Sequence, residues 1–119
     1  MRAQTRDQIA TVLVELQMQT ASNEQLVEVI DRAYSGAELT SAEQRQIEYR
    51  FIALLRYWEN VHYQYRQGLY DDFEFASQLE AVRHSFRNTR PLAEFWCRAK
   101  LEYSSEFAAE IDNLLDKKC

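Results

Sequence analysis

Apolar residues recur every three or four positions through most of the chain, which is the spacing of one face of an α-helix. These stripes cover residues 9–16, 26–34, 47–69, 75–86, 92–103 and 107–115. The first stripe is ambiguous, because Val12, Val14, Leu16 and Met18 also alternate as a strand would. Helix is favoured there, since the neighbouring Glu, Gln, Leu and Met residues prefer helix and a lone strand would have no partner.

Residues that begin or end helices lie between these stripes. Gly36 and Gly68 each follow a stripe, where a left-handed glycine commonly ends a helix, and Pro91 suits the first turn of another. Residues able to cap helix starts occur in three pairs: Ser22 with Gln25, Thr40 with Glu43, and Asp71 with Glu74. The segment 41–67 contains neither glycine nor proline, so we predict one helix there, about 40 Å long.

These marks predict an all-α fold, a single-domain helical bundle of about six helices around the long central helix at 41–67. A chain of 119 residues is long enough to bury one real core, and we expect one domain over residues 1–119. Two glycines and one proline are too few for the turns of a protein built from many short strands. Residues 117–119 are expected to be a disordered tail.

Charge limits the classes of partner. The formal net charge of -5 argues against a nucleic-acid binder, because phosphate contacts need a concentrated positive field. Basic residues gather at 81–100 and acidic residues at 102–116, and we expect these groups to be solvated or paired with each other.

Several chemical classes have no support in the sequence. The spacing of Cys97 and Cys119 matches neither a disulfide framework nor a CxxC metal site, so reduced thiols are expected. No apolar run approaches the roughly 20 residues that cross a bilayer. Nucleophile-elbow, phosphate-loop and H-E-x-x-H motifs are missing as well, and we predict no cofactor. A non-catalytic protein is favoured, and the alternative is an enzyme in which Glu59, near aromatic residues, acts as a general base.

Glu59 and His62 are the best candidates for chemistry in the chain. They form an E-x-x-H pair, and two such pairs plus two further Glu residues hold two metals in ferritin-like bundles. The only other histidine, His84, is predicted to lie off the core side of its helix together with Glu80. We therefore expect His62 to be a hydrogen-bonded core residue, and keep metal binding by Glu59 and His62 as an alternative.

Aromatic residues on the central segment offer two further interpretations. Tyr57, Trp58, Tyr65 and Trp96 are expected to be core, with a small-molecule pocket between helices as the alternative. Tyr49, Ile52 and Tyr63 lie opposite the main apolar stripe, so we expect the central helix to have neighbours on both flanks. The alternative is that one flank binds a partner.

Part of the sequence resembles a known group of proteins. The segments LLRYWENVHYQYRQGLYDDFEF (54–75), TRPLAEFW (89–96) and YSSEFAAEIDNLL (103–115) resemble uncharacterised bacterial proteins with one N-terminal membrane helix and a small helical domain. The likeness extends from about Arg2 to Leu115, and its most specific part is W-E-N-x-x-Y-Q-Y-R-x-G-L. It implies that residues 1–6 are the end of a linker from a membrane anchor, and that the chain either begins after such an anchor or is a soluble relative without one. Arg2 and Arg6 would then favour a cytoplasmic domain at the inner face of the membrane.

The sequence therefore predicts a non-catalytic interaction or scaffold domain with an unknown protein partner, or with a second copy of itself. The alternatives are a metal-binding helical protein centred on Glu59 and His62, and a bundle that senses a small ligand or lipid. The candidate binding residues are Tyr49, Tyr57, Trp58, Glu59, His62, Tyr63, Tyr65 and Arg66.

Overall fold

Six α-helices and one short 3-10 helix follow one another without a strand in the computed structural model, which describes all 119 residues. Helix α3 has 26 residues, so the prediction of an all-α fold with one long helix is confirmed. The elements are α1 (Arg2–Ala21), α2 (Glu24–Tyr34), α3 (Ser41–Arg66), α4 (Asp72–Asn88), α5 (Arg90–Ala99), η1 (Lys100–Glu102) and α6 (Ser105–Leu114).

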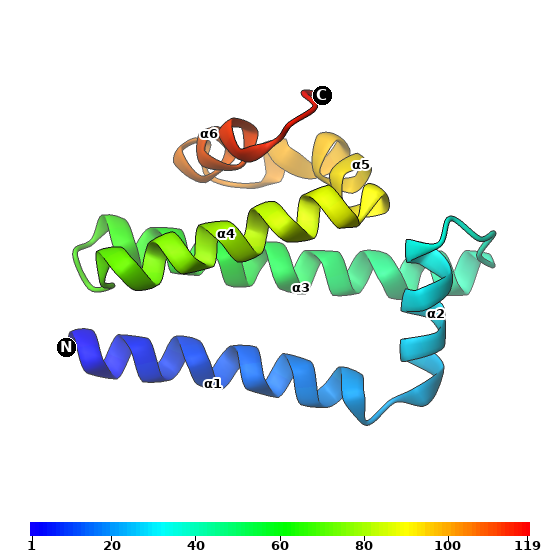
Figure 1. The fold of residues 1–119 in the computed structure, drawn as a ribbon, viewed down its shortest axis with the longest axis horizontal. Coiled ribbons are helices and arrows are strands. Elements are labelled where there is room, and N and C mark those ends of the chain that lie inside the picture. Colours follow the sequence, from blue (N-terminus) through cyan, green and yellow to red (C-terminus); the bar gives the residue numbers. More distant parts are fainter.

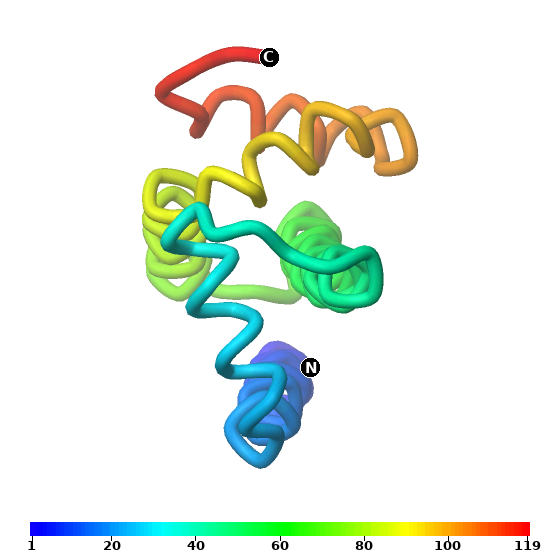
Figure 2. Tube along the Cα trace, turned by 90° about the vertical axis from the view of Figure 1, so that its right-hand side faces the viewer, coloured from blue at the N-terminus to red at the C-terminus, as the bar shows by residue number.

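The helices form three tiers (Figures 1 and 2). Helices α3 and α4 lie side by side and antiparallel in the middle tier, with α1 on one side of this pair and α5 and α6 on the other. Helix α2 runs across one end and joins α1 to the start of α3 (Figure 1). Helix α3 therefore lies between two tiers and contacts α1, α2, α4, α5 and α6.

Local chemistry explains where α3 begins and ends. The Thr40 hydroxyl accepts a hydrogen bond from the backbone N–H of Glu43, whose carboxylate accepts one from the Thr40 N–H, as the predicted capping box requires. Past the other end, Gly68 has a φ of +75°, a conformation in which a side chain would be strained. The predicted bounds of the central helix differ from the observed ones by a single residue.

The other predicted caps were partly right. Asp71 accepts hydrogen bonds from the backbone N–H groups of Phe73 and Glu74 and caps α4 as expected. The prediction for α2 was wrong by one residue, because the Asn23 side chain accepts from the Leu26 N–H. Ser22 instead donates to the Gln19 carbonyl at the end of α1.

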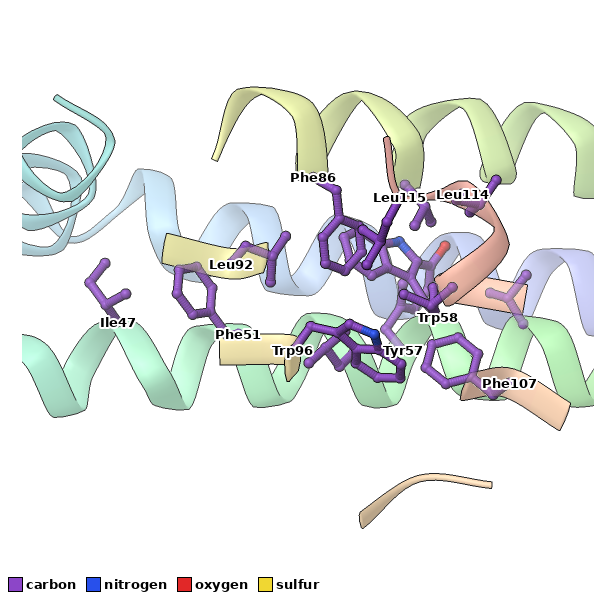
Figure 3. Close-up of a cluster of buried hydrophobic side chains, with 14 of the residues drawn as sticks. Ile47, Phe51, Tyr57, Trp58, Phe86, Leu92, Trp96, Phe107, Leu114 and Leu115 are labelled. Atoms are coloured by element: carbon purple, nitrogen blue, oxygen red, sulfur yellow. The ribbon is translucent and has the colours of Figure 1, made fainter. Parts of the chain in front are cut away.

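The core is aromatic and draws on all six α-helices. The edge-to-face pair of Trp96 and Phe107 joins α5 to α6, with ring centroids 5.7 Å apart, and Trp58 packs at 6.1 Å from Phe86 of α4. Figure 3 shows these side chains directed into one interior. Trp96 is completely buried, and its indole N–H donates to the Asp112 carboxylate at 3.0 Å. The strand alternative for residues 12–18 is excluded, since these residues lie within α1.

The two ends of the chain are both attached to the fold. Residues 2–6, expected to be linker, form the first turns of α1, and Arg2 Nε donates to the Gly68 carbonyl at 3.0 Å. Cys119 forms a disulfide with Cys97 of α5, so the expectation of reduced thiols was wrong. The residues after α6 bring Cys119 back to α5. The spacing of the two cysteines in the sequence does not predict this long-range contact. The disulfide holds the segment 117–119, which had been expected to be disordered.

Pairing between the basic and acidic segments is present at two points. Arg87 of α4 donates to Asp116 at 2.6 Å, and Lys100 donates to Asp112 at 3.3 Å. None of the helices combines the length and the apolar character that crossing a membrane requires.

Candidate functional site

All eight candidate residues lie on α3, and the structure divides them among three environments. Three side chains are buried, two are partly buried, and three are exposed to solvent. The buried side chains are those of Tyr57, Trp58 and His62. Glu59 and Tyr65 are partly buried, and Tyr49, Tyr63 and Arg66 are exposed. The candidate residues therefore lie on different sides of α3 and do not form a single site.

Both carboxylate oxygens of Glu59 accept hydrogen bonds, and one of these bonds joins α3 to the start of α6. One carboxylate oxygen accepts a hydrogen bond from the backbone N–H of Ser104, at 2.8 Å, and the other accepts from Arg56 at 3.0 Å. Ser104 is the residue that caps α6, and its own hydroxyl accepts from the Phe107 N–H. A carboxylate with both oxygens used in this way fixes the start of α6 against α3 and is poorly placed to act as a general base.

His62 lies among aromatic rings. Its ring centroid is 6.0 Å from that of Phe75 and 5.9 Å from that of Phe107, and its exposed fraction is 8%. Burial lowers the pKa of His62 below its usual value. The core placement expected for His62 is confirmed, but the hydrogen bond expected with it is missing, because the buried Nδ1 has no protein partner. A cavity of 20 Å³ beside the ring has room for about one water molecule.

The metal-binding alternative has no support in this geometry. Metal centres in helical bundles need three or more side-chain ligands that converge on one point. The structure contains no group of three or more His, Cys, Asp or Glu side chains able to hold an ion. His84 and Glu80 are exposed on α4, as predicted, so the E-x-x-H pair of Glu59 and His62 has no second half.

Of the four aromatic residues with a pocket as their alternative role, two line a cleft and two do not. Tyr57 and Trp58 line a cleft of 230 Å³ between α1, α3 and α4. The Tyr57 hydroxyl accepts a hydrogen bond from Gln78 at 2.9 Å. Tyr65 instead stacks on Phe75 with centroids 3.8 Å apart, and Trp96 lies in the core below α6.

The outer face of α3 is exposed, and we define it by Tyr49, Ile52 and Tyr63. Their exposed fractions are 70%, 38% and 48%. The expectation that neighbouring helices cover both flanks was therefore wrong. α1, α4, α5 and α6 all pack on the remaining sides, which leaves this flank at the edge of the molecule (Figure 2). Tyr57, one of the candidate binding residues, is 5% exposed and belongs to the core.

Arg50 was missed at the sequence level. It lies on the apolar side of α3, at an angle between those of Tyr57 and Leu54 on a helical wheel, and it lines the same cleft as Tyr57 and Trp58. An arginine inside an apolar stripe is the sequence signal that would have identified it, because such a charge needs a partner.

Comparisons with protein-family models, with curated proteins and with solved structures each found no match to this chain. The fold defines an all-α helical bundle with an exposed aromatic face on its longest helix. The resemblance to membrane-anchored helical proteins stays a prediction.

Proposed function

We propose that this protein is a non-catalytic interaction domain that binds a partner protein through the outer face of α3. The observation that carries the proposal is the exposed stripe of Tyr49, Ile52 and Tyr63, which extends about 21 Å along one side of the helix. These three side chains lie within about 60° of one another around the helix axis. Large side chains exposed on one side of a rigid helix favour an interaction site over a purely structural role.

The residues around this stripe indicate the chemistry of the partner. Arg45 and Arg56 lie on the same side of α3 and are exposed, and the Arg66 guanidinium lies 5.6 Å from the centre of the Tyr63 ring. Tyrosine and arginine are enriched in protein interfaces, where they supply contact area and charge-assisted hydrogen bonds. We therefore propose an amphipathic helix as the ligand, with apolar residues against the stripe and an acidic residue opposite Arg45, because Arg56 and Arg66 already pair with Glu59 and Glu106.

Site-specific photocrosslinking in the native host tests this proposal. A photoreactive amino acid at position 49 or 63 should crosslink to one discrete partner, whereas one at Tyr34, an exposed tyrosine of α2, should not. The substitution Ile52→Asp should abolish both crosslinks while leaving the circular dichroism spectrum unchanged. A crosslink between two copies of this chain would identify the face as a homo-oligomer interface instead. If light scattering shows a monomer and no position gives a discrete crosslink, the proposal is wrong.

For the cellular compartment, we propose an oxidising environment in place of the cytoplasm. The cytoplasmic expectation depended on the position of Arg2 and Arg6 just after a membrane anchor. The Cys97–Cys119 disulfide supports the opposite side of the membrane, because disulfides are rare where glutathione and thioredoxin keep thiols reduced. A maleimide reagent applied to freshly lysed cells should label neither cysteine until a reductant is added. Labelling without reductant would show that the cysteines are reduced and would favour the cytoplasm.

A further inference from the structure

A cleft of 230 Å³ separates α1 from the α3 and α4 pair, on the side of α3 away from the outer face. Figures 1 and 2 show α1 as a separate tier beside that pair. Only two residues of this 20-residue helix, Thr5 and Ile9, are buried. The cleft walls are mostly apolar and come from α1 (Leu13 and Leu16), α3 (Leu54 and Trp58) and α4 (Ala81).

Arg50 supplies one positive charge to this apolar cleft. Its Nη1 donates to the Thr20 hydroxyl at 2.7 Å, while Nε is shielded from solvent and has no hydrogen-bond partner. No carboxylate lies within 4.0 Å of the Arg50 guanidinium, although the other two partly buried arginines, Arg32 and Arg83, each have one. A shielded Nε–H without a hydrogen-bond partner is costly, and a bidentate carboxylate is the partner that best matches the planar edge formed by Nε and Nη2.

We propose that this cleft binds a small amphipathic carboxylic acid. The carboxylate pairs with the Nε and Nη2 edge of Arg50, which carries no protein hydrogen bond. The apolar body lies between Leu16 of α1 and Leu54 and Trp58 of α3. Because α1 buries so few residues, it can move outward to admit the ligand and then close over it.

The volume sets the size of the ligand. An apolar cavity of about 150 Å³ holds benzene, so the cleft of 230 Å³ suits a carboxylic acid of about ten non-hydrogen atoms. Octanoate has this size and is the probe of choice. The site does not rest on the interaction proposed for the outer face, because its residues lie on the other side of α3.

Binding is measured by isothermal titration calorimetry of octanoate and of 1-octanol, which has the same chain without the charge. Octanoate should bind one molecule per chain, at least tenfold more tightly than 1-octanol. Arg50→Gln should weaken octanoate at least tenfold and remove this preference. Arg45→Gln, at an exposed arginine of the same helix, should bind octanoate as the parent does.

Two further measurements hold even if Arg50→Gln does not fold. Ala81 is exposed at the rim of the cleft, so Ala81→Trp should fill the entrance and abolish octanoate binding with Arg50 intact. In heteronuclear NMR spectra, octanoate should shift the indole N–H resonance of Trp58 and leave that of Trp96 in place. The proposal is overturned by no binding at millimolar octanoate, by equal binding of 1-octanol, or by binding that survives Ala81→Trp.

Discussion

The carboxylate of Glu59 accepts a hydrogen bond from the backbone N–H of Ser104, 45 residues further along the chain. This bond joins the middle of α3 to the residue that caps α6, so Glu59→Ala should destabilise the fold. Leaving a partly buried N–H without its charged acceptor costs about 2 kcal/mol, and the urea midpoint should fall accordingly. Glu102→Ala, at an exposed acid nearby, should leave the midpoint unchanged. Equal stability of the two variants would show that the bond contributes nothing.

His62 should make the stability depend on pH. Its pKa is lowered in the folded protein, first by burial and then by the charge of Arg66, while Glu110, Glu106 and Glu59 act in the opposite direction. The unfolded chain, in which histidine has a pKa of about 6.5, therefore binds a proton before the folded protein does. Stability should be complete above pH 6.5 and should fall as the pH drops through the interval down to the folded pKa. The slope cannot exceed about 1.4 kcal/mol per pH unit for one proton.

Chemical denaturation between pH 7.5 and 5.5 measures this slope. His62→Leu should flatten it, because the remaining groups with resolved shifts titrate at lower or higher pH. His84→Gln, at the exposed histidine of α4, should leave the slope as it is. A slope that persists in His62→Leu would assign the pH dependence to another group.

The disulfide should contribute measurably to stability. Cys97 and Cys119 are separated by 22 residues, and closing a loop of that length restricts the unfolded chain by about 3 kcal/mol. Cys97→Ser with Cys119→Ser should lower the free energy of unfolding by about this amount, and a reductant should do the same to the parent but not to the double variant. The prediction would be contradicted if the free energy of unfolding of the parent were the same with and without reductant.

The sequence predicts the central helix well because its determinants are local. The capping box of Thr40 and Glu43, the apolar spacing and Gly68 all act within a few residues of one another, and they set both ends of α3. The same periodicity placed His62 on the core side correctly. Local signals of this kind also identified the start of α4 at Asp71.

Long-range contacts explain what the sequence could not predict. A helical wheel indicates that Tyr49 and Tyr63 share a side of α3, but it does not say whether another helix covers that side. The bond from Glu59 to Ser104 and the disulfide both depend on how α5 and α6 fold back over α3. In the sequence Glu59 therefore resembled half of a metal site, and only the tertiary structure reveals it as the partner of a backbone N–H.

The protonation of Glu43 should lower the stability of the fold at acidic pH. The Arg32 guanidinium donates to both oxygens of the Glu43 carboxylate, with Nη1 at 3.1 Å from Oε1, and together with the Thr40 N–H it lowers the pKa of Glu43 to about 2. Because the folded pKa lies below the ordinary value of 4.5, the stabilisation is complete above pH 4.5 and is lost as the pH falls toward 2.

Thermal unfolding of Glu43→Gln across this interval measures the contribution. The variant should be less stable than the parent at pH 6, and the difference should shrink steadily as the pH approaches 2, because protonation removes the same charge from the parent. Glu38→Gln, at an exposed acid in the loop before α3, should follow the parent throughout. A constant difference between Glu43→Gln and the parent over the whole interval would mean that the ion pair with Arg32 does not titrate there, and that the capping box acts through its hydrogen bonds alone.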